Sequence, residues 1–373
     1  MPVHNTTSKA LWRIAMALGM ACATICSVRR CQAATQEQLY PVPVRGKYGF
    51  MDRRGRIAIQ PLFDRVRLFS EGMAVVAIGG KYGYIDTRGS VIVPPKFEDA
   101  ASFSEGLAAV EVGKKWGYVD KSGRLVIEPR FGSELGGGGS FSEGLAPVLF
   151  NGKMGYINHS GHFVIEPRFD LAEQFSEGLA AVGMVVNDSK VQDSRIKFGY
   201  IDKTGKIAVA FGYAGARSFH EGLAVVSIYR IGVKFYPQAV IDHAGAQVSA
   251  PFDVGIGDFH EGLARINQNE NIGFMDKTGK QVIPPQFREF DDRGPSEFYE
   301  GLAAVSLPNG RSGYINHAGR MVLAARFGIA CPFVEGVALV FERGRIGYID
   351  RTGKYIWSGS TNQMPNNEEA GCF

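Results

Sequence analysis

Short motifs recur along nearly the whole chain, and this repetition constrains the fold more than any other feature. The hexapeptide FSEGLA stands at 103–108, 141–146 and 175–180. FHEGLA follows at 219–224 and 259–264, and FYEGLA at 298–303. A period of roughly 34 to 44 residues is typical of repeat proteins, in which each unit buries its apolar face against its neighbours.

Each unit reads as three short strands. In one copy these strands are Leu107 to Val112, Trp116 to Asp120 and Arg124 to Glu128. The first strand alternates buried-type and polar residues with a period of two. The repetition therefore predicts an all-β fold, a tandem array of about nine three-stranded antiparallel meanders that is locally propeller-like.

The turn between the second and third strands has its own signature. Nine tetrapeptides, from DRRG at 52 to DRTG at 350, begin with Asp or Asn and end with Gly. A short side-chain oxygen accepts a hydrogen bond from the backbone two residues on, and Gly adopts the positive φ that closes the turn. Because Asn replaces Asp at 158 and 316, we expect turns here rather than metal ligands.

Two columns of phenylalanine account for 16 of the chain's 25 phenylalanines and are expected to pack between units. One column precedes the FxEG motif and the other begins it. The members are Phe63, Phe97, Phe131, Phe169, Phe211, Phe252, Phe287 and Phe327, then Phe69, Phe103, Phe141, Phe175, Phe219, Phe259, Phe298 and Phe333.

The Glu of FxEG recurs eight times. Catalysis does not require eight equivalent acids, so we expect this Glu to accept backbone N–H groups and hold the linker between units. A contact role for part of the row is the alternative. The x position holds Ser, His, Tyr or Val and is predicted to face outward.

The combined pattern K-x-G-[YF]-[IVM]-[DN]-x-x-G-x-x-[VI]-x-P-x-F, followed by FxEGLA, resembles the WG-repeat family of bacterial proteins over about residues 40–357. Only Trp116-Gly117 carries the dipeptide that names the family. The resemblance implies an all-β tandem repeat and no common catalytic residues. Both terminal units look complete, with no blade shared between the chain ends. We therefore expect an open superhelical spiral rather than a closed ring, with closure by simple contact as the alternative.

The first 33 residues read as a signal peptide. Lys9 and Arg13 precede the apolar run 14–25, and Cys31-Gln32-Ala33 resembles a cleavage site. Because Arg29 and Arg30 stand between the apolar run and the cleavage site, an uncleaved membrane anchor is the alternative. The predicted organisation is a signal peptide at 1–33, a WG-repeat β domain at 34–357 and a flexible C-terminal tail at 358–373. We expect a periplasmic or secreted protein with no integral membrane span after cleavage.

Charge argues against a nucleic-acid partner. The signal segment holds four of the 41 basic residues and no acidic one, which leaves 41 − 4 = 37 basic against 37 acidic residues. Cys331 and Cys372 remain after cleavage, either bridged or unpaired.

The chain carries no recognisable catalytic, cofactor or metal motif, and we expect none of these sites. Its informative irregularities are insertions at 183–197 and 228–238, which should project from the same edge of the array. The second contains an aromatic and cationic cluster typical of partner-binding surfaces, with tolerated loop growth as the alternative. The cluster comprises Tyr229, Arg230, Lys234, Phe235 and Tyr236.

A column of Phe and Tyr follows the second-strand glycines. We expect this column in the core with its hydroxyls bonded, and an exposed stacking platform for glycans is the alternative. The expected function is a non-enzymatic scaffold that binds a protein or a cell-envelope glycan. The alternative is a carbohydrate-active enzyme that uses paired carboxylates near the loop insertions.

Overall fold

The computed structural model describes residues 38–132, 138–188, 193–230, 236–288, 297–363 and 372. The predicted signal peptide at 1–33 lies outside these residues. The chain divides into Met1–Gln38 and Leu39–Phe373, and the fold reported below is that of the second unit. No helix in the described part of the chain is long and apolar enough to cross a membrane.

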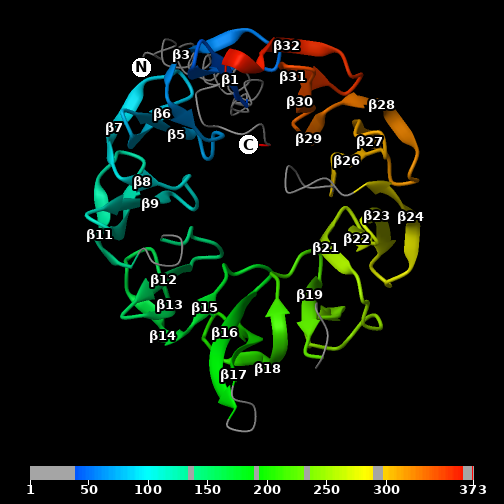
Figure 1. The fold of residues 1–373 in the computed structure, drawn as a ribbon. Coiled ribbons are helices and arrows are strands. Elements are labelled where there is room, and N and C mark those ends of the chain that lie inside the picture. Colours follow the sequence, from blue (N-terminus) through cyan, green and yellow to red (C-terminus); the bar gives the residue numbers. More distant parts are fainter. Residues whose placement is uncertain are drawn as a thin grey trace, which may run out of the picture. The chain divides into compact units, whose positions relative to one another are not determined.

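The second unit is all-β, as predicted, and is built from successive antiparallel meanders that we call blades (Figure 1). Eight blades have three main strands each, and the sixth has two. The first five blades are β1–β3 (Tyr40–Val44, Lys47–Met51, Ile57–Phe63), β5–β7 (Met73–Ile78, Lys81–Asp86, Val91–Phe97), β9–β11 (Leu107–Val112, Lys115–Asp120, Leu125–Phe131), β12–β14 (Ala146–Phe150, Lys153–Ile157, Phe163–Phe169) and β16–β18 (Leu179–Asp188, Asp193–Asp202, Ile207–Ala216). The last four are β19–β20 (Leu223–Ile228, Gln238–Asp242), β22–β24 (Leu263–Gln268, Asn271–Asp276, Gln281–Arg288), β26–β28 (Leu302–Ser306, Ser312–Ile315, Met321–Phe327) and β30–β32 (Val337–Glu342, Arg345–Asp350, Tyr355–Ser360).

Several blades gain a short extra strand that the three-stranded prediction lacks. The segment that joins one blade to the next turns back and pairs with the first strand of that next blade, as Asp99↔Glu111 shows for β8 and β9. This pairing satisfies backbone groups that would otherwise form an open edge. The extra strands are β4 (Arg65–Val66), β8 (Asp99–Ala100), β15 (Leu171–Ala172), β21 (Gly255–His260), β25 (Phe298–Tyr299) and β29 (Ile329–Val334).

The glycine of the second strand is required by the close approach of the third strand. A Cβ at Gly117 would lie 2.5 Å from the Ile127 carbonyl oxygen and 2.7 Å from the Pro129 nitrogen. The sixth blade carries Ala239 at this position. Among the described residues, that blade continues past β20 only through the isolated bridges Ile241↔Gln247 and Gln238↔Phe252. An alanine in the second strand thus coincides with the loss of the regular third strand.

The phenylalanine columns form the core between blades, as predicted. All but Phe69, Phe211 and Phe252 are buried, and those three are partly buried against the same clusters. The aromatic column of the second strand is also core rather than an exposed platform. Its tyrosine hydroxyls donate to backbone carbonyls, as Tyr84 does to Ala101 and Tyr156 to Glu173, both at 2.8 Å.

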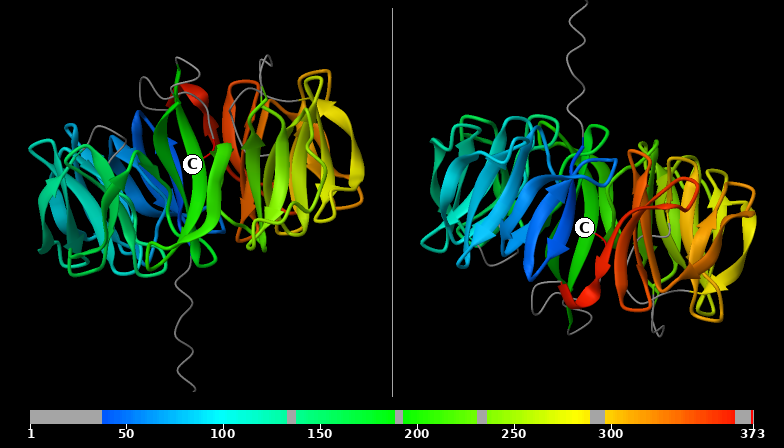
Figure 2. Two further views of the ribbon diagram at one scale, coloured as in Figure 1. Left: turned by 90° about the horizontal axis from the view of Figure 1, so that it is seen from below. Right: turned by 90° about the horizontal axis from the view of Figure 1, so that it is seen from above.

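The preference for an open spiral is wrong, because the first and last blades pack against each other (Figures 1 and 2). The buried Tyr348 hydroxyl on β31 donates to the Pro41 carbonyl on β1 at 2.8 Å. Tyr40 donates to the Val334 carbonyl at 3.1 Å. Within the described parts of the chain no strand is exchanged between these two blades, so the array closes by side-to-side contact, the alternative that the sequence left open.

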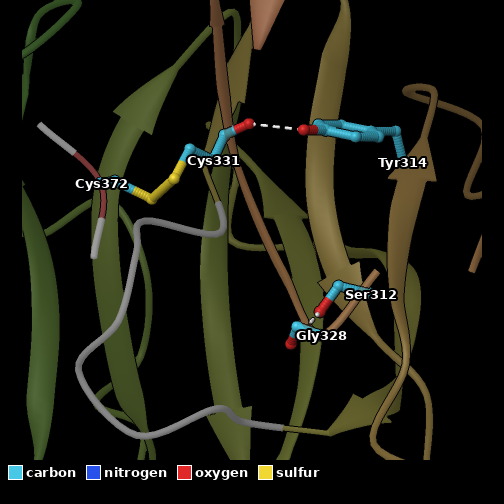
Figure 3. The surroundings of a disulfide bond; sticks show 5 residues. All are labelled: Ser312, Tyr314, Gly328, Cys331 and Cys372. Atoms are coloured by element: carbon cyan, nitrogen blue, oxygen red, sulfur yellow. Dashed lines mark hydrogen bonds between the residues drawn. A yellow bond between two sulfur atoms is a disulfide. The ribbon is translucent and has the colours of Figure 1, made fainter. Parts of the chain in front are cut away.

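The C-terminal segment is tied to the last blade. β32 continues beyond residue 357 to Ser360, and a 3₁₀ turn, η1, covers Thr361–Gln363. Cys372 forms a disulfide with Cys331 on β29, and the Cys331 carbonyl accepts a hydrogen bond from Tyr314 at 2.7 Å (Figure 3). The two cysteines that the sequence left as bridged or free are therefore bridged.

Candidate functional site

The repeated glutamates hold neighbouring blades together. The Glu143 carboxylate accepts the backbone N–H of Gly178, the glycine of the next linker, at 3.1 Å. The same bond joins seven successive pairs of linkers, from Glu71 and Gly106 to Glu300 and Gly336. The predicted locking role is correct in kind, but the bond reaches the following linker rather than the Glu's own.

Each of these seven glutamates also meets a Lys, Arg or His side chain from the turn of the blade beyond. Lys203 contacts Glu143 at 2.9 Å, and His159 contacts Glu105 at 3.2 Å. The further pairs are Lys121–Glu71, His243–Glu177, Lys277–Glu221, His317–Glu261 and Arg351–Glu300. Where the first and last blades meet, Arg53 of the first blade donates to the backbone carbonyl of Glu335 in the last linker at 3.1 Å. The network thus continues across the seam.

Backbone geometry supports the structural role of this row. All eight linker glutamates have positive φ, between 48° and 54°. This conformation is unfavourable for a residue with a long side chain, so the surrounding bonds must hold it. Burial alone would raise the pKa of the Glu143 carboxyl, but hydrogen bonds from Lys203 and Gly178 outweigh it and lower that pKa. A carboxylate that stays ionised in this way is engaged as an acceptor.

The prediction that the x residue of FxEG faces outward is wrong for several linkers. Ser70, Ser104, Ser142 and Ser176 are half-buried, and each donates to the phenylalanine carbonyl of the next linker, at 2.6–2.7 Å. Three later linkers carry the aromatic rings of His220, His260 and Tyr299 here instead, and the last carries Val334. His260 lies 5.6 Å from His220 and 4.9 Å from Tyr299, measured between ring centroids. Consecutive linkers lie close enough for their x side chains to meet, which the sequence did not reveal.

The Asp and Asn of the nine turns act as predicted. Asn158 Oδ1 accepts the backbone N–H groups of Ser160 and His162, and Asp202 Oδ1 accepts those of Thr204 and Lys206. Within the described residues, no group of three or more His, Cys, Asp or Glu side chains is arranged to hold a metal ion.

Three residues of the predicted partner-binding cluster lie in the described part of the chain, whereas Lys234 and Phe235 lie outside it. Tyr229 donates to the Ile196 carbonyl of the other insertion, so the two insertions share one edge as predicted. Arg230 pairs with Asp253 at 2.8 Å. Tyr236 is exposed, and its ring packs edge-on against Tyr229 with centroids 5.2 Å apart.

A hollow of about 560 Å³ opens at the base of the two insertions. Phe198 directly follows the first insertion, Ser227 directly precedes the second, and Gln238 is the last residue of the second. Its other lining residues are Met154, Leu171, Ala172, Glu173, Ala214, Gly215, Ala216, Arg217 and Val225. The insertions and the hollow thus coincide, which makes this region the candidate binding site. No sequence motif marked the hollow itself.

The hollow combines apolar and polar groups. Phe198 is half-buried, whereas Trp116 and Ile272 at the equivalent positions of other blades are buried. Glu173 is exposed at the opening, and its carboxylate has no partner among the described residues. Arg217 approaches Asp258 at 3.6 Å. Among the described lining residues Glu173 is the single carboxylate, so the lining itself does not supply the pair that glycoside hydrolysis needs.

The sequence profile of the family described as "WG containing repeat" matches seven segments of the chain. They are 48–82, 82–116, 116–153, 154–184, 198–229, 272–310 and 313–345, together more than half of its 373 residues. The chain belongs to the WG-repeat family. The unmatched stretch between 229 and 272 contains β20, the second strand of the sixth blade, where Ala239 replaces the glycine.

No curated protein sequence matches the chain. Among solved structures, a eukaryotic initiation factor is similar with a TM-score of 0.62 and 13% identity, covering 90% of this chain and all of the other. BamB from Moraxella catarrhalis is similar at a TM-score of 0.41 and 12% identity, covering 85% of this chain and 97% of that one. At such low identity the first likeness supports the fold alone, and the second carries no argument.

Proposed function

We propose that this WG-repeat chain is a non-enzymatic periplasmic or secreted scaffold that binds a protein or a glycan of the cell envelope. The repeat architecture supports a scaffold role, since tandem arrays present long continuous surfaces for contact. The observation that carries the proposal is that the repeated side chains make structural contacts. The glutamates, turn acids and linker serines that recur along the chain bond to neighbouring blades or to their own turns.

Two further observations support the compartment and the place of binding. The disulfide between Cys331 and Cys372 is the kind of bond that persists in oxidising compartments outside the cytosol. The irregular features, namely the two insertions and the hollow at their base, lie together on blades five and six. A partner is therefore expected at this part of the array.

The test is retention of envelope components on the purified protein. Immobilised protein is incubated separately with detergent-solubilised envelope proteins and with purified peptidoglycan sacculi, and bound material is identified by mass spectrometry and sugar analysis. We expect one class to be retained reproducibly. Failure of both in repeated experiments would contradict the proposal, and steady release of sugar fragments from sacculi would favour the carbohydrate-active alternative.

A further inference from the structure

We propose that the hollow between β15, β18 and β19 binds one or two neutral sugar residues of a glycan chain. This inference rests on the proposed function and names the ligand class for one site within it. The volume of about 560 Å³ lies within the range of about 300–1,000 Å³ that is usual for small-molecule sites.

The hollow arises from an irregularity in the chain between blades five and six. The two phenylalanine columns are six residues apart at Phe169 and Phe175, but eight apart at Phe211 and Phe219. The longer segment carries Ala214, Gly215 and Ala216, three small residues that line the hollow. Small side chains on an extended path leave a space that bulkier residues would fill.

The apolar part of the lining suits one face of a sugar ring. Phe198 contributes a half-buried ring, whereas Met154 and Val225 line the hollow but are themselves buried. Sugar rings carry C–H groups on their faces and hydroxyls at their edges, so they pair an apolar contact with surrounding hydrogen bonds. An aromatic ring provides a large rigid contact area for such a face.

The polar side chains that line the hollow suit the hydroxyl groups of a sugar. The exposed Glu173 carboxylate can accept hydrogen bonds from two hydroxyl groups, and such charge-assisted bonds are the stronger kind. Gln238 Oε1 accepts the Ile256 N–H at 2.6 Å, which orients its amide so that Nε2 remains as a donor. Arg217 is balanced by Asp258. The Glu173 carboxylate, which has no partner among the described residues, disfavours phosphate-bearing and other anionic ligands.

The experiment uses the full-length processed protein with three single variants. Glu173→Gln removes the charge and keeps the shape, and Ala214→Phe fills the space. Glu166→Gln is the matched control, because Glu166 is exposed on the outer strand β14 of the blade before the hollow. Binding is measured by isothermal titration with chitohexaose and cellohexaose and by retention on peptidoglycan sacculi. Thermal unfolding confirms that each variant folds.

We expect the wild type and Glu166→Gln to bind at least one of these probes equally well. Glu173→Gln should weaken binding at least tenfold, and Ala214→Phe should abolish it. If the wild type binds but both hollow variants bind equally well, the site assignment is overturned while the scaffold proposal stands. If the wild type binds no sugar probe but retains envelope proteins, the sugar assignment is likewise overturned. If Ala214→Phe does not fold, Glu173→Gln decides the outcome.

Discussion

At the scale of single residues, each linker glutamate combines an unfavourable backbone conformation with a role in the contacts between blades. Each linker glutamate adopts a positive φ that a long side chain disfavours, and among the described residues the carboxylates of seven of the eight bond to the next linker's glycine and to a Lys, Arg or His side chain from the blade beyond. The cost of the backbone conformation, on the order of 1 kcal/mol, is offset by charge-assisted hydrogen bonds. This coupling explains why glutamate, and not only glycine, recurs at the position.

We expect Glu143→Gln to lower the free energy of unfolding by about 1 kcal/mol. The neutral amide loses the ion pair with Lys203 and accepts a weaker bond from Gly178, and partial exposure of both side chains limits the loss. The measurement is urea unfolding followed by tryptophan fluorescence. Glu166→Gln is the control, because Glu166 is an exposed acid whose side chain has no partner among the described residues, and it should leave the unfolding midpoint unchanged. An equal shift of the midpoint in both variants would contradict a stabilising role for the contacts of Glu143.

The same site predicts a pH dependence. The pKa of Glu143 is lower in the folded protein than its ordinary value of 4.5, so the stabilisation is complete above about pH 5 and is lost as the pH falls through the folded value. Lys203→Met removes one cause of that lowered pKa. The stability gap between wild type and Lys203→Met should therefore be present at pH 7 and narrow between pH 5 and pH 3. Lys115→Met, an exposed control, should show no such narrowing.

At the scale of the elements, the second-strand glycine sets the geometry of a blade. Its missing Cβ allows the third strand to cross within contact distance at a point where the register shifts. The strand pattern, the turns and the phenylalanine columns were all predictable, because each depends on a local motif that recurs. The role of this glycine was not predictable from the sequence, because the clash that it avoids involves backbone about ten residues away.

Gly117→Ala should destabilise the protein by about 2 kcal/mol or more, since the new Cβ would lie 2.5 Å from the Ile127 carbonyl oxygen. Gly212→Ala is the matched control, because a Cβ there meets nothing within 4 Å and its φ is not positive. Differential scanning calorimetry of both variants compares the two sites directly. Equal melting temperatures would mean that the strand crossing does not require glycine.

At the scale of the whole array, closure depends on contacts between residues at opposite ends of the sequence. Tyr348 bonds to Pro41, and a Cβ at Gly55 in the first blade would lie 2.0 Å from the Ile356 carbonyl oxygen in the last. Elsewhere the turn glycine meets a side chain of the preceding blade, as Gly123 meets Val93. The seam therefore uses the same turn glycine as other contacts between blades but places it against backbone.

The disulfide strengthens the blade at this seam. It closes a segment of 41 residues, for which the chain-entropy account gives a stabilisation of about 3–4 kcal/mol. Reduction with dithiothreitol should therefore lower the melting temperature by several degrees. The Cys331→Ser/Cys372→Ser double variant should melt near the reduced wild type and should not respond to the reductant. A response in that variant would assign the effect to another cause.

The sequence by itself determined the repeat, the all-β class, the turn chemistry and the core columns, because each is a short-range pattern that recurs with a fixed period. It also placed the two insertions on one edge. It did not determine how the first and last blades meet, where the glutamates bond or that a hollow lies below the insertions. These features depend on the rotation between successive blades and on small residues that create space, and only the tertiary structure brings such distant groups together.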